Sequence, residues 1–176
     1  MTFEQSAVTR PAEGGATEEP DWDAVYADQL PRIYAYFRFR LGAAAEIEDL
    51  VSRTFEKAWR ARHRYRRNLA GFSTWLLKIA QNVGIDYLRS RRSHVEIDVA
   101  MELPTERTPE MDVERSSDLA RLIRLIGELS ERERELVSLK YGADINNISI
   151  AKLTGLSVGN VATILHRAVQ TLRSKW

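Results

Sequence analysis

The segment from Ile148 to Val161 reads as a short helix, a tight turn and a second helix, and it constrains the fold more than any other part of the chain. Two helices that cross at a steep angle need a small residue for close approach and a left-handed turn residue, which Ala151 and Gly155 supply. Ser157 is placed to cap the second helix. Apolar residues then repeat on one face of that helix, at Val161, Leu165, Ala168, Val169 and Leu172.

The other face of this second helix is polar. A helix of this kind fits the major groove of DNA, and the first few residues of such a helix usually contact the bases. We therefore predict a DNA-binding face made of Ser157, Asn160, Thr163, His166, Arg167 and Arg173. The alternative is a helical hairpin in which Gly155 merely ends a helix.

Composition excludes several classes of protein. The chain has 176 residues, of which 44% are hydrophobic, enough for one packed domain or two small ones. It has no cysteine, and its three histidines (His63, His94 and His166) lack the spacing of a zinc site, so we expect no metal, no cofactor and no disulfide. No apolar run is long enough to span a bilayer, and the first residues do not resemble a signal peptide. We expect a cytoplasmic protein without membrane insertion.

The net charge of +1 conceals a segregation of charge along the chain. Residues 1–31 carry a net −6, 32–95 carry +9, 96–118 carry −6 and 119–176 carry +4. The acidic blocks hold all five prolines and show little periodicity. We therefore predict a disordered acidic tail over 1–21, a helical domain over 22–95, a flexible acidic linker over 96–118 and a second helical domain over 119–176. Such a linker fixes no geometry, so we expect the two domains to associate weakly or not at all.

Helical periodicity in the first domain predicts three helices and no strand, hence an all-α fold. The first helix ends at Gly42 and buries Ile33, Tyr36, Phe37 and Leu41. The second starts near Ala45 and places on one face Ile47, Leu50, Val51, Phe55, Ala58 and Trp59. The third runs from about Phe72 to Arg92 and buries Phe72, Leu76, Ile79, Ala80, Val83 and Tyr87.

Opposite the apolar face of the third helix runs a polar stripe of Lys78, Asn82, Asp86 and Arg89. It adjoins a basic, aromatic loop over 63–71, and Trp75 lies one turn before it. Cations for phosphates, an amide for base edges and an aromatic ring for stacking suit a surface that holds nucleic acid, partly single-stranded. The alternative is an ordinary solvated helix face.

Four segments in one order carry a family resemblance. They are DLVSRTFEKAWR over 49–60, FSTWLLKIAQN over 72–82 with DYLR over 86–89, LSERERELV over 129–137 with Ser130 and Glu133 spaced as a capping box, and GLSVGNVATILHRAVQTLR over 155–173. Their order and spacing resemble the extracytoplasmic-function, or group IV, sigma factors of the sigma-70 family, which keep only conserved regions two and four.

The resemblance implies a dissociable promoter-specificity subunit of RNA polymerase rather than an enzyme. It implies contact with the beta-prime clamp of the polymerase core through Asp49, Leu50, Val51, Arg53, Phe55, Glu56 and Trp59. It implies recognition of the minus-ten element, including a flipped-out base, by Arg66, Arg67, Asn68, Trp75, Lys78, Asn82, Asp86 and Arg89. The DNA-binding face of the last helix would meet the minus-thirty-five element, while the second domain meets the beta flap. An anti-sigma factor is the expected inhibitor.

One departure from the family pattern bears on DNA binding. Ala162-Thr163-Ile164 replaces the usual Lys-Ser-Arg, which removes two cations from the last helix and predicts weaker phosphate contact, or a surface used by a protein partner. A two-domain helix-turn-helix regulator that does not bind polymerase is the main alternative function. A hydrolase or transferase would need a nucleophile and base, metal ligands or a phosphate loop, and the sequence shows none of these.

Overall fold

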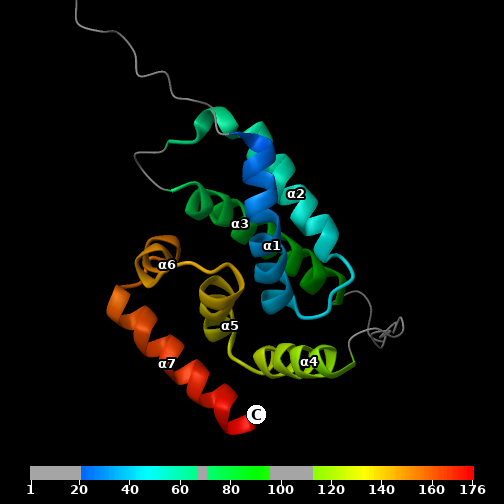
Figure 1. Ribbon diagram of the computed structural model, residues 1–176, viewed down its shortest axis with the longest axis vertical. Coiled ribbons are helices and arrows are strands. Elements are labelled where there is room, and N and C mark those ends of the chain that lie inside the picture. Colours follow the sequence, from blue (N-terminus) through cyan, green and yellow to red (C-terminus); the bar gives the residue numbers. More distant parts are fainter. Residues whose placement is uncertain (1–20, 67–70, 96–112) are drawn as a thin grey trace, which may run out of the picture.

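The computed structural model describes residues 21–66, 71–95 and 113–176, and every regular element in them is helical (Figure 1). The all-α prediction is confirmed. In chain order the elements are α1 (Trp22–Leu41), α2 (Ile47–Arg60), the 3-10 turn η1 (Arg62–Arg64), α3 (Phe72–Val95), α4 (Val113–Gly127), α5 (Glu131–Val137), the π-helical turn η2 (Ser138–Gly142), α6 (Asn147–Thr154) and α7 (Val158–Lys175).

Helix α1 begins eleven residues before its first predicted core position, Ile33. The Asp21 carboxylate caps it by accepting from the backbone N–H groups of Asp23 and Ala24, at 3.1 and 3.3 Å. Pro31 lies inside the helix, although proline removes one backbone donor there. Residues 22–31 are thus helical despite belonging to the acidic block by charge. The helix ends at Gly42, as predicted, where a φ of 76° suits glycine.

The first bundle consists of α1, α2 and α3, which pack on one another. The predicted core of α2 is confirmed from Ile47 to Ala58, but Trp59 is 49% exposed at the end of the helix. On α3 the predicted Leu76, Ala80 and Val83 are buried, and Phe72, Ile79 and Tyr87 are half-buried. The helix also buries a second side, which the sequence pattern did not indicate, at Leu77 and Gln81.

The second bundle consists of α4 to α7. Helix α4 begins at Val113, so the last residues of the predicted linker are helical. The predicted capping box at the start of α5 is present, with the Glu133 N–H donating to Ser130 Oγ and the Ser130 N–H donating to Glu133 Oε2, at 3.3 and 3.1 Å. The charge pattern therefore predicted an end for the linker that lies inside α4. The capping-box motif at Ser130 and Glu133 correctly predicted the start of α5.

The helix-turn-helix prediction is confirmed in α6 and α7. Gly155 ends α6 with a φ of 73°, and the chain turns by 105° between the two helices. Ser157 then caps α7 by accepting from the Asn160 N–H at 3.2 Å. The buried side of α7 consists of Val161, Leu165 and Ala168, as expected, with Val169 and Leu172 half-buried.

The two bundles pack against each other and share one continuous apolar core. Helix α1 lies against α4, α5 and above all η2, while α3 contacts α6 (Figure 1). The expectation of weakly associated domains is therefore wrong for this structure. That expectation was based only on the polar, acidic character of the linker. The packing of the two bundles depends instead on side chains of the helices, far from the linker.

A polar cluster lies at the centre of the contact between the bundles. Three donors of the first bundle converge on the Glu135 carboxylate of α5: Tyr36 Oη at 3.1 Å, Arg40 Nε at 2.5 Å and Gln81 Nε2 at 2.8 Å. Arg40 also donates to Glu131 at 3.0 Å. Complete burial raises the pKa of Tyr36 well above its ordinary value, and the Glu135 charge raises it further, so the hydroxyl keeps the proton that it donates.

Close backbone approach completes the contact. Gly142, the last residue of η2, faces the backbone of α1 so closely that an added Cβ would lie 2.9 Å from the Ala35 carbonyl oxygen. No larger residue fits there without displacement of one bundle from the other. The contact thus depends on a glycine as well as on the Glu135 ion pair.

Candidate polymerase and nucleic-acid interfaces

The residues predicted to bind polymerase fall into two groups on α2. Asp49, Arg53, Glu56 and Trp59 are exposed, whereas Leu50, Val51 and Phe55 are buried in the core of the first bundle. Arg60 donates to Glu56 at 2.6 Å across one helical turn. The exposed group forms a mixed-charge surface that ends in a large aromatic ring. The buried group supports that surface from within, although Val51 also reaches the groove described next.

An apolar groove lies beside this surface, between α1 and α2. It has a volume of about 480 Å³, and its lining is Tyr26, Leu30, Pro31, Tyr34, Glu48, Val51 and Ser52. The α1 wall was not predicted, because its residues lie in the acidic charge block 1–31 or, like Tyr34, were given no role. The signal was present in the spacing of Tyr26, Leu30 and Tyr34, at four-residue intervals that place them on one helix face.

The predicted minus-ten stripe exists on α3. Lys78, Asn82, Asp86 and Arg89 are all exposed along one side of the helix. Lys57 of α2 approaches Asp86 at 3.7 Å, so this carboxylate faces a cation at the boundary of the stripe. Asn82 offers its amide to solvent between Lys78 and the Lys57–Asp86 pair, which suits contact with a base edge near a phosphate.

An aromatic cluster supports the stripe at the start of α3. Trp75, predicted as a stacking residue, is half-buried between Tyr65 and Phe72, each with a ring centroid 5.3 Å away. Trp22 of α1 joins the cluster through edge contacts with Phe72 and Trp59. Packing of this kind fixes Trp75 as a support for the loop before α3 rather than as a freely exposed ring.

The basic loop before α3 is described only in part. Arg66 is exposed, while Arg67 and Asn68 lie outside the described residues. Tyr65 packs against Phe72 with a centroid separation of 5.3 Å, so the two ends of the loop are joined by ring contacts. Arg62 stacks over the Trp59 ring at 4.2 Å and links this region to the end of α2.

The predicted minus-thirty-five residues on α7 are all exposed, but they form two neighbouring groups. At roughly 100° per residue, Asn160, Thr163 and Arg167 share the outermost stripe. The Ser157 hydroxyl caps the helix, so its first role is structural. Ala162 is exposed and Ile164 is half-buried against the core. The helix therefore presents one cation, one amide and one hydroxyl on its outermost stripe.

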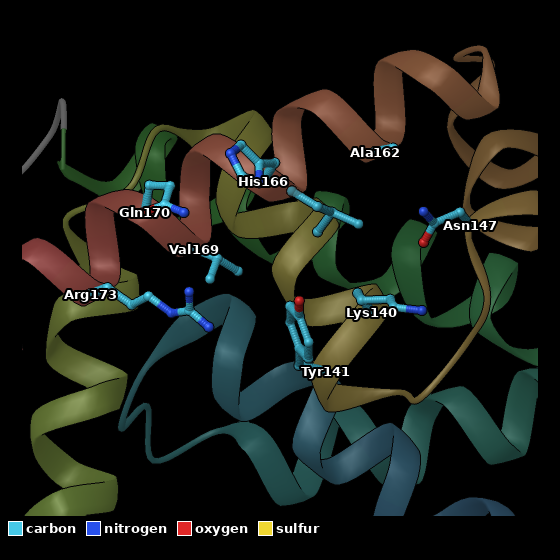
Figure 2. A pocket seen from close by; sticks show the side chains of 9 residues that line it. Lys140, Tyr141, Asn147, Ala162, His166, Val169, Gln170 and Arg173 are labelled. Carbon is cyan, nitrogen blue, oxygen red and sulfur yellow. The ribbon is translucent and has the colours of Figure 1, made fainter.

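His166 and Arg173 instead line a groove between α7 and η2 (Figure 2). Its volume is about 420 Å³, and Lys140 and Tyr141 of η2 form the opposite wall. Tyr141 is 54% exposed. Neither η2 residue was singled out from the sequence, since an isolated Lys-Tyr pair carries no periodic signal.

Comparison with known proteins assigns both bundles to one protein family. Residues 25–94 match Sigma-70 region 2, and residues 119–172 match Sigma-70, region 4. The ECF RNA polymerase sigma factor BldN of Streptomyces coelicolor is 30% identical over 160 residues, which cover 89% of this chain and 61% of BldN. RpoE of Cereibacter sphaeroides is 27% identical over 89% of this chain and 86% of its own.

A solved structure shares the whole fold. The sigma factor RpoE of Bartonella quintana, in complex with the anti-sigma factor NepR, aligns with a TM-score of 0.71 at 21% identity, over 88% of this chain and 95% of that chain. A helical first bundle joined to a helix-turn-helix bundle is the architecture of a two-domain DNA-binding protein. The sequence matches identify the family within this class of proteins. The chain belongs to the ECF sigma factors of the sigma-70 family.

Among the helices of the described residues, none alone is long and apolar enough to cross a membrane.

Proposed function

We propose that this chain is a sigma factor that directs RNA polymerase core to specific promoters and starts transcription there, without catalysing a reaction itself. The observation that carries the proposal is the separation of three exposed surfaces on three helices: the mixed-charge end of α2, the polar stripe of α3 and the outward face of α7. A regulator that binds duplex DNA alone needs only the third surface. We place its action in the cytoplasm, where polymerase and DNA are found.

The α2 surface, with Asp49, Arg53, Glu56 and Trp59, would contact the beta-prime clamp of the core. Aromatic residues beside charged ones often dominate such interfaces, and Trp59 is the exposed aromatic here. The neighbouring α1–α2 groove would receive an apolar group of the same partner. The second bundle would meet the beta flap of the polymerase.

The α3 stripe would read the minus-ten element, with Asn82 at the edge of an extruded base. Extrusion costs a few kcal/mol, which pocket contacts to the base can offset. Arg66 to Asn68 would hold the neighbouring backbone, while Trp75 supports the loop. Helix α7 would read the minus-thirty-five element through Asn160, Thr163 and Arg167, with His166 and Arg173 beside them.

The relative of known structure is bound to an anti-sigma factor, and we propose the same kind of inhibitor for this chain. The exposed apolar residues that favour a protein partner include Tyr26 beside the α1–α2 groove and Tyr141 beside the α7 groove.

Binding to core polymerase in the absence of DNA tests the proposal against its main alternative. A sigma factor binds core before it meets a promoter, whereas a helix-turn-helix regulator of the alternative class does not need core at all. Purified chain titrated with core enzyme, followed by size-exclusion chromatography or anisotropy, should give a saturable complex. Lack of binding to core, together with specific binding to duplex DNA, would establish the alternative.

A further inference from the structure

One apolar side chain of α3 is exposed beside the polar stripe. Ile85 is 50% exposed, even with the second bundle packed on α3. Every other large apolar side chain of α3 that the structure describes is buried or half-buried. Packing within the chain therefore does not account for an isoleucine at this position.

Helix geometry places Ile85 at the edge of the stripe. At about 100° per residue, its side chain lies roughly 20°, 40° and 60° around the helix from Lys78, Arg89 and Asn82. Asn82 and Arg89 are also its neighbours along the axis, three residues before it and four residues after it. Ile85 thus lies between two exposed cations and beside the amide that the stripe offers to a base.

The exposed part of Ile85 belongs to the stripe rather than to the contact between the bundles. On its other side lie Gln81, which is 7% exposed and donates to Glu135 of α5, and Leu88, which is half-buried. Exposure therefore falls around the helix from Asn82 through Ile85 to Gln81. The uncovered methyl groups of Ile85 thus share the exposed face of Asn82.

The thymine methyl is the group on a DNA base that suits an isoleucine. It is the one methyl group on the edges of the four bases, whereas the other edge groups donate or accept hydrogen bonds. The branched Ile85 side chain is stiff at χ1, so it presents its apolar surface in a fixed direction. A thymine beside the base at Asn82 would place its methyl on Ile85 and remove apolar surface of both from water.

We infer that Ile85 is a specificity-determining residue of the α3 surface, and that it selects thymine at one position of the minus-ten element through the methyl group. The inference deepens the proposed function and rests on it. It adds an apolar contact to a surface whose other reading groups are polar. Promoters of this chain therefore contain a thymine next to the base that depends on Asn82.

Removal of one methyl group from the DNA tests the inference. On a promoter located by mapping of RNA 5′ ends, each thymine of the minus-ten element is replaced in turn by deoxyuridine, which pairs like thymine but lacks the methyl. Open-complex formation by core polymerase with the wild-type chain should fall about fourfold at one position, as expected for the loss of one buried methyl-sized contact. In Ile85→Ala, thymine and deoxyuridine should be equivalent at that position.

Leu88→Ala is the matched control. Leu88 lies on the same helix, three residues after Ile85, but roughly 120° from Asn82 around the axis. This variant should keep the fourfold preference for thymine over deoxyuridine. Both substitutions introduce a good helix former, and circular dichroism checks that the helix content is unchanged. Ile85→Ala should bind core polymerase without DNA as tightly as the wild type does.

Three results would overturn the inference: a minus-ten element without thymine, a wild-type chain indifferent to every single deoxyuridine, or an Ile85→Ala variant that keeps the thymine preference. Weaker binding of core by Ile85→Ala would also contradict it, because Ile85 would then contact protein. Failure of the proposed function gives a different result, since the chain then neither binds core nor creates start sites, and the inference falls with it.

Discussion

Helices α3 and α7 carry the two proposed DNA-reading surfaces, yet they are packed in different ways. Helix α3 is buried along two sides, one facing its own bundle through residues such as Leu76 and the other reaching the second bundle through Gln81. Helix α7 is buried along one side only, at Val161, Leu165 and Ala168. The surface of α3 is thus a narrow stripe, while α7 presents a broad face.

The difference shows that a reading surface and a domain contact can share one helix. On α3, Asn82 of the stripe directly follows Gln81 of the interdomain cluster. A movement of one bundle on the other would therefore disturb a side chain adjacent to the proposed reading surface. On α7 the exposed face is independent of the α1 contact, which involves η2 instead.

The largest effect should come from breaking the contact between the bundles. Glu135→Arg places a second cation against the buried Arg40, and the loss of a buried pair costs about 3 to 5 kcal/mol. Calorimetry should show the single transition of the shared core separating into two. The swap of Arg40→Glu with Glu135→Arg should restore part of the stability, and a double variant no more stable than Glu135→Arg alone would contradict the pairing.

Trp59→Ala tests the α2 surface, which is proposed to contact polymerase rather than DNA. A central aromatic contact in an interface often contributes about 2 kcal/mol, so core binding should weaken by roughly 30-fold. Binding of duplex DNA by the chain should not change. Arg91→Ala is a suitable comparison, because Arg91 is exposed on α3 beside Tyr87 and lies outside the proposed polymerase surface. Equal losses in both variants would count against Trp59 as an anchor.

On α3 itself, Asn82→Ala should affect recognition without affecting polymerase contact. Loss of a base-edge contact reduces discrimination by about 1 to 3 kcal/mol at one position. Open-complex formation on promoter variants, followed by permanganate footprinting, should show relaxed preference at a single minus-ten base. Ser90→Ala on the same helix should behave as wild type. Unchanged preference and opening in Asn82→Ala would remove Asn82 from the reading surface.

The smallest effect concerns α7. Ala162 is exposed, so Ala162→Lys should add one phosphate contact and steepen the slope of log affinity on log salt by about 0.9. Ile164 is packed against the core, so Ile164→Arg should lower the melting temperature instead. Salt-titrated DNA binding and thermal melting of the two single variants separate these effects. An unchanged slope in Ala162→Lys would mean that this part of α7 does not face DNA.

The sequence predicted the local parts of this structure well. Amphipathic spacing located α2 and α3, and the chemistry of Gly155 and Ser157 located the helix-turn-helix, because each signal lies within a few residues of the feature that it specifies. The exposed stripe from Lys78 to Arg89 was found in the same way. Its role in DNA recognition remains a prediction.

The parts that sequence reasoning missed depend on distant residues. Glu135 and Arg40 are 95 positions apart, and each alone resembles an ordinary surface charge. Gln81 and Gly142 likewise gain their roles only from the packing of one bundle on the other. The start of α1 was missed for a local reason, since its acidic residues and Pro31 obscured a helix that burial of Ile33 helps to stabilise.

The central claim is that this chain confers promoter specificity on RNA polymerase. Transcription by core polymerase on genomic DNA fragments, with and without the purified chain, followed by mapping of RNA 5′ ends, tests it most directly. We predict new start sites that appear only with the chain and that share sequence elements near positions minus ten and minus thirty-five. An identical set of start sites with and without the chain, although the chain is folded and core is active, would contradict the account.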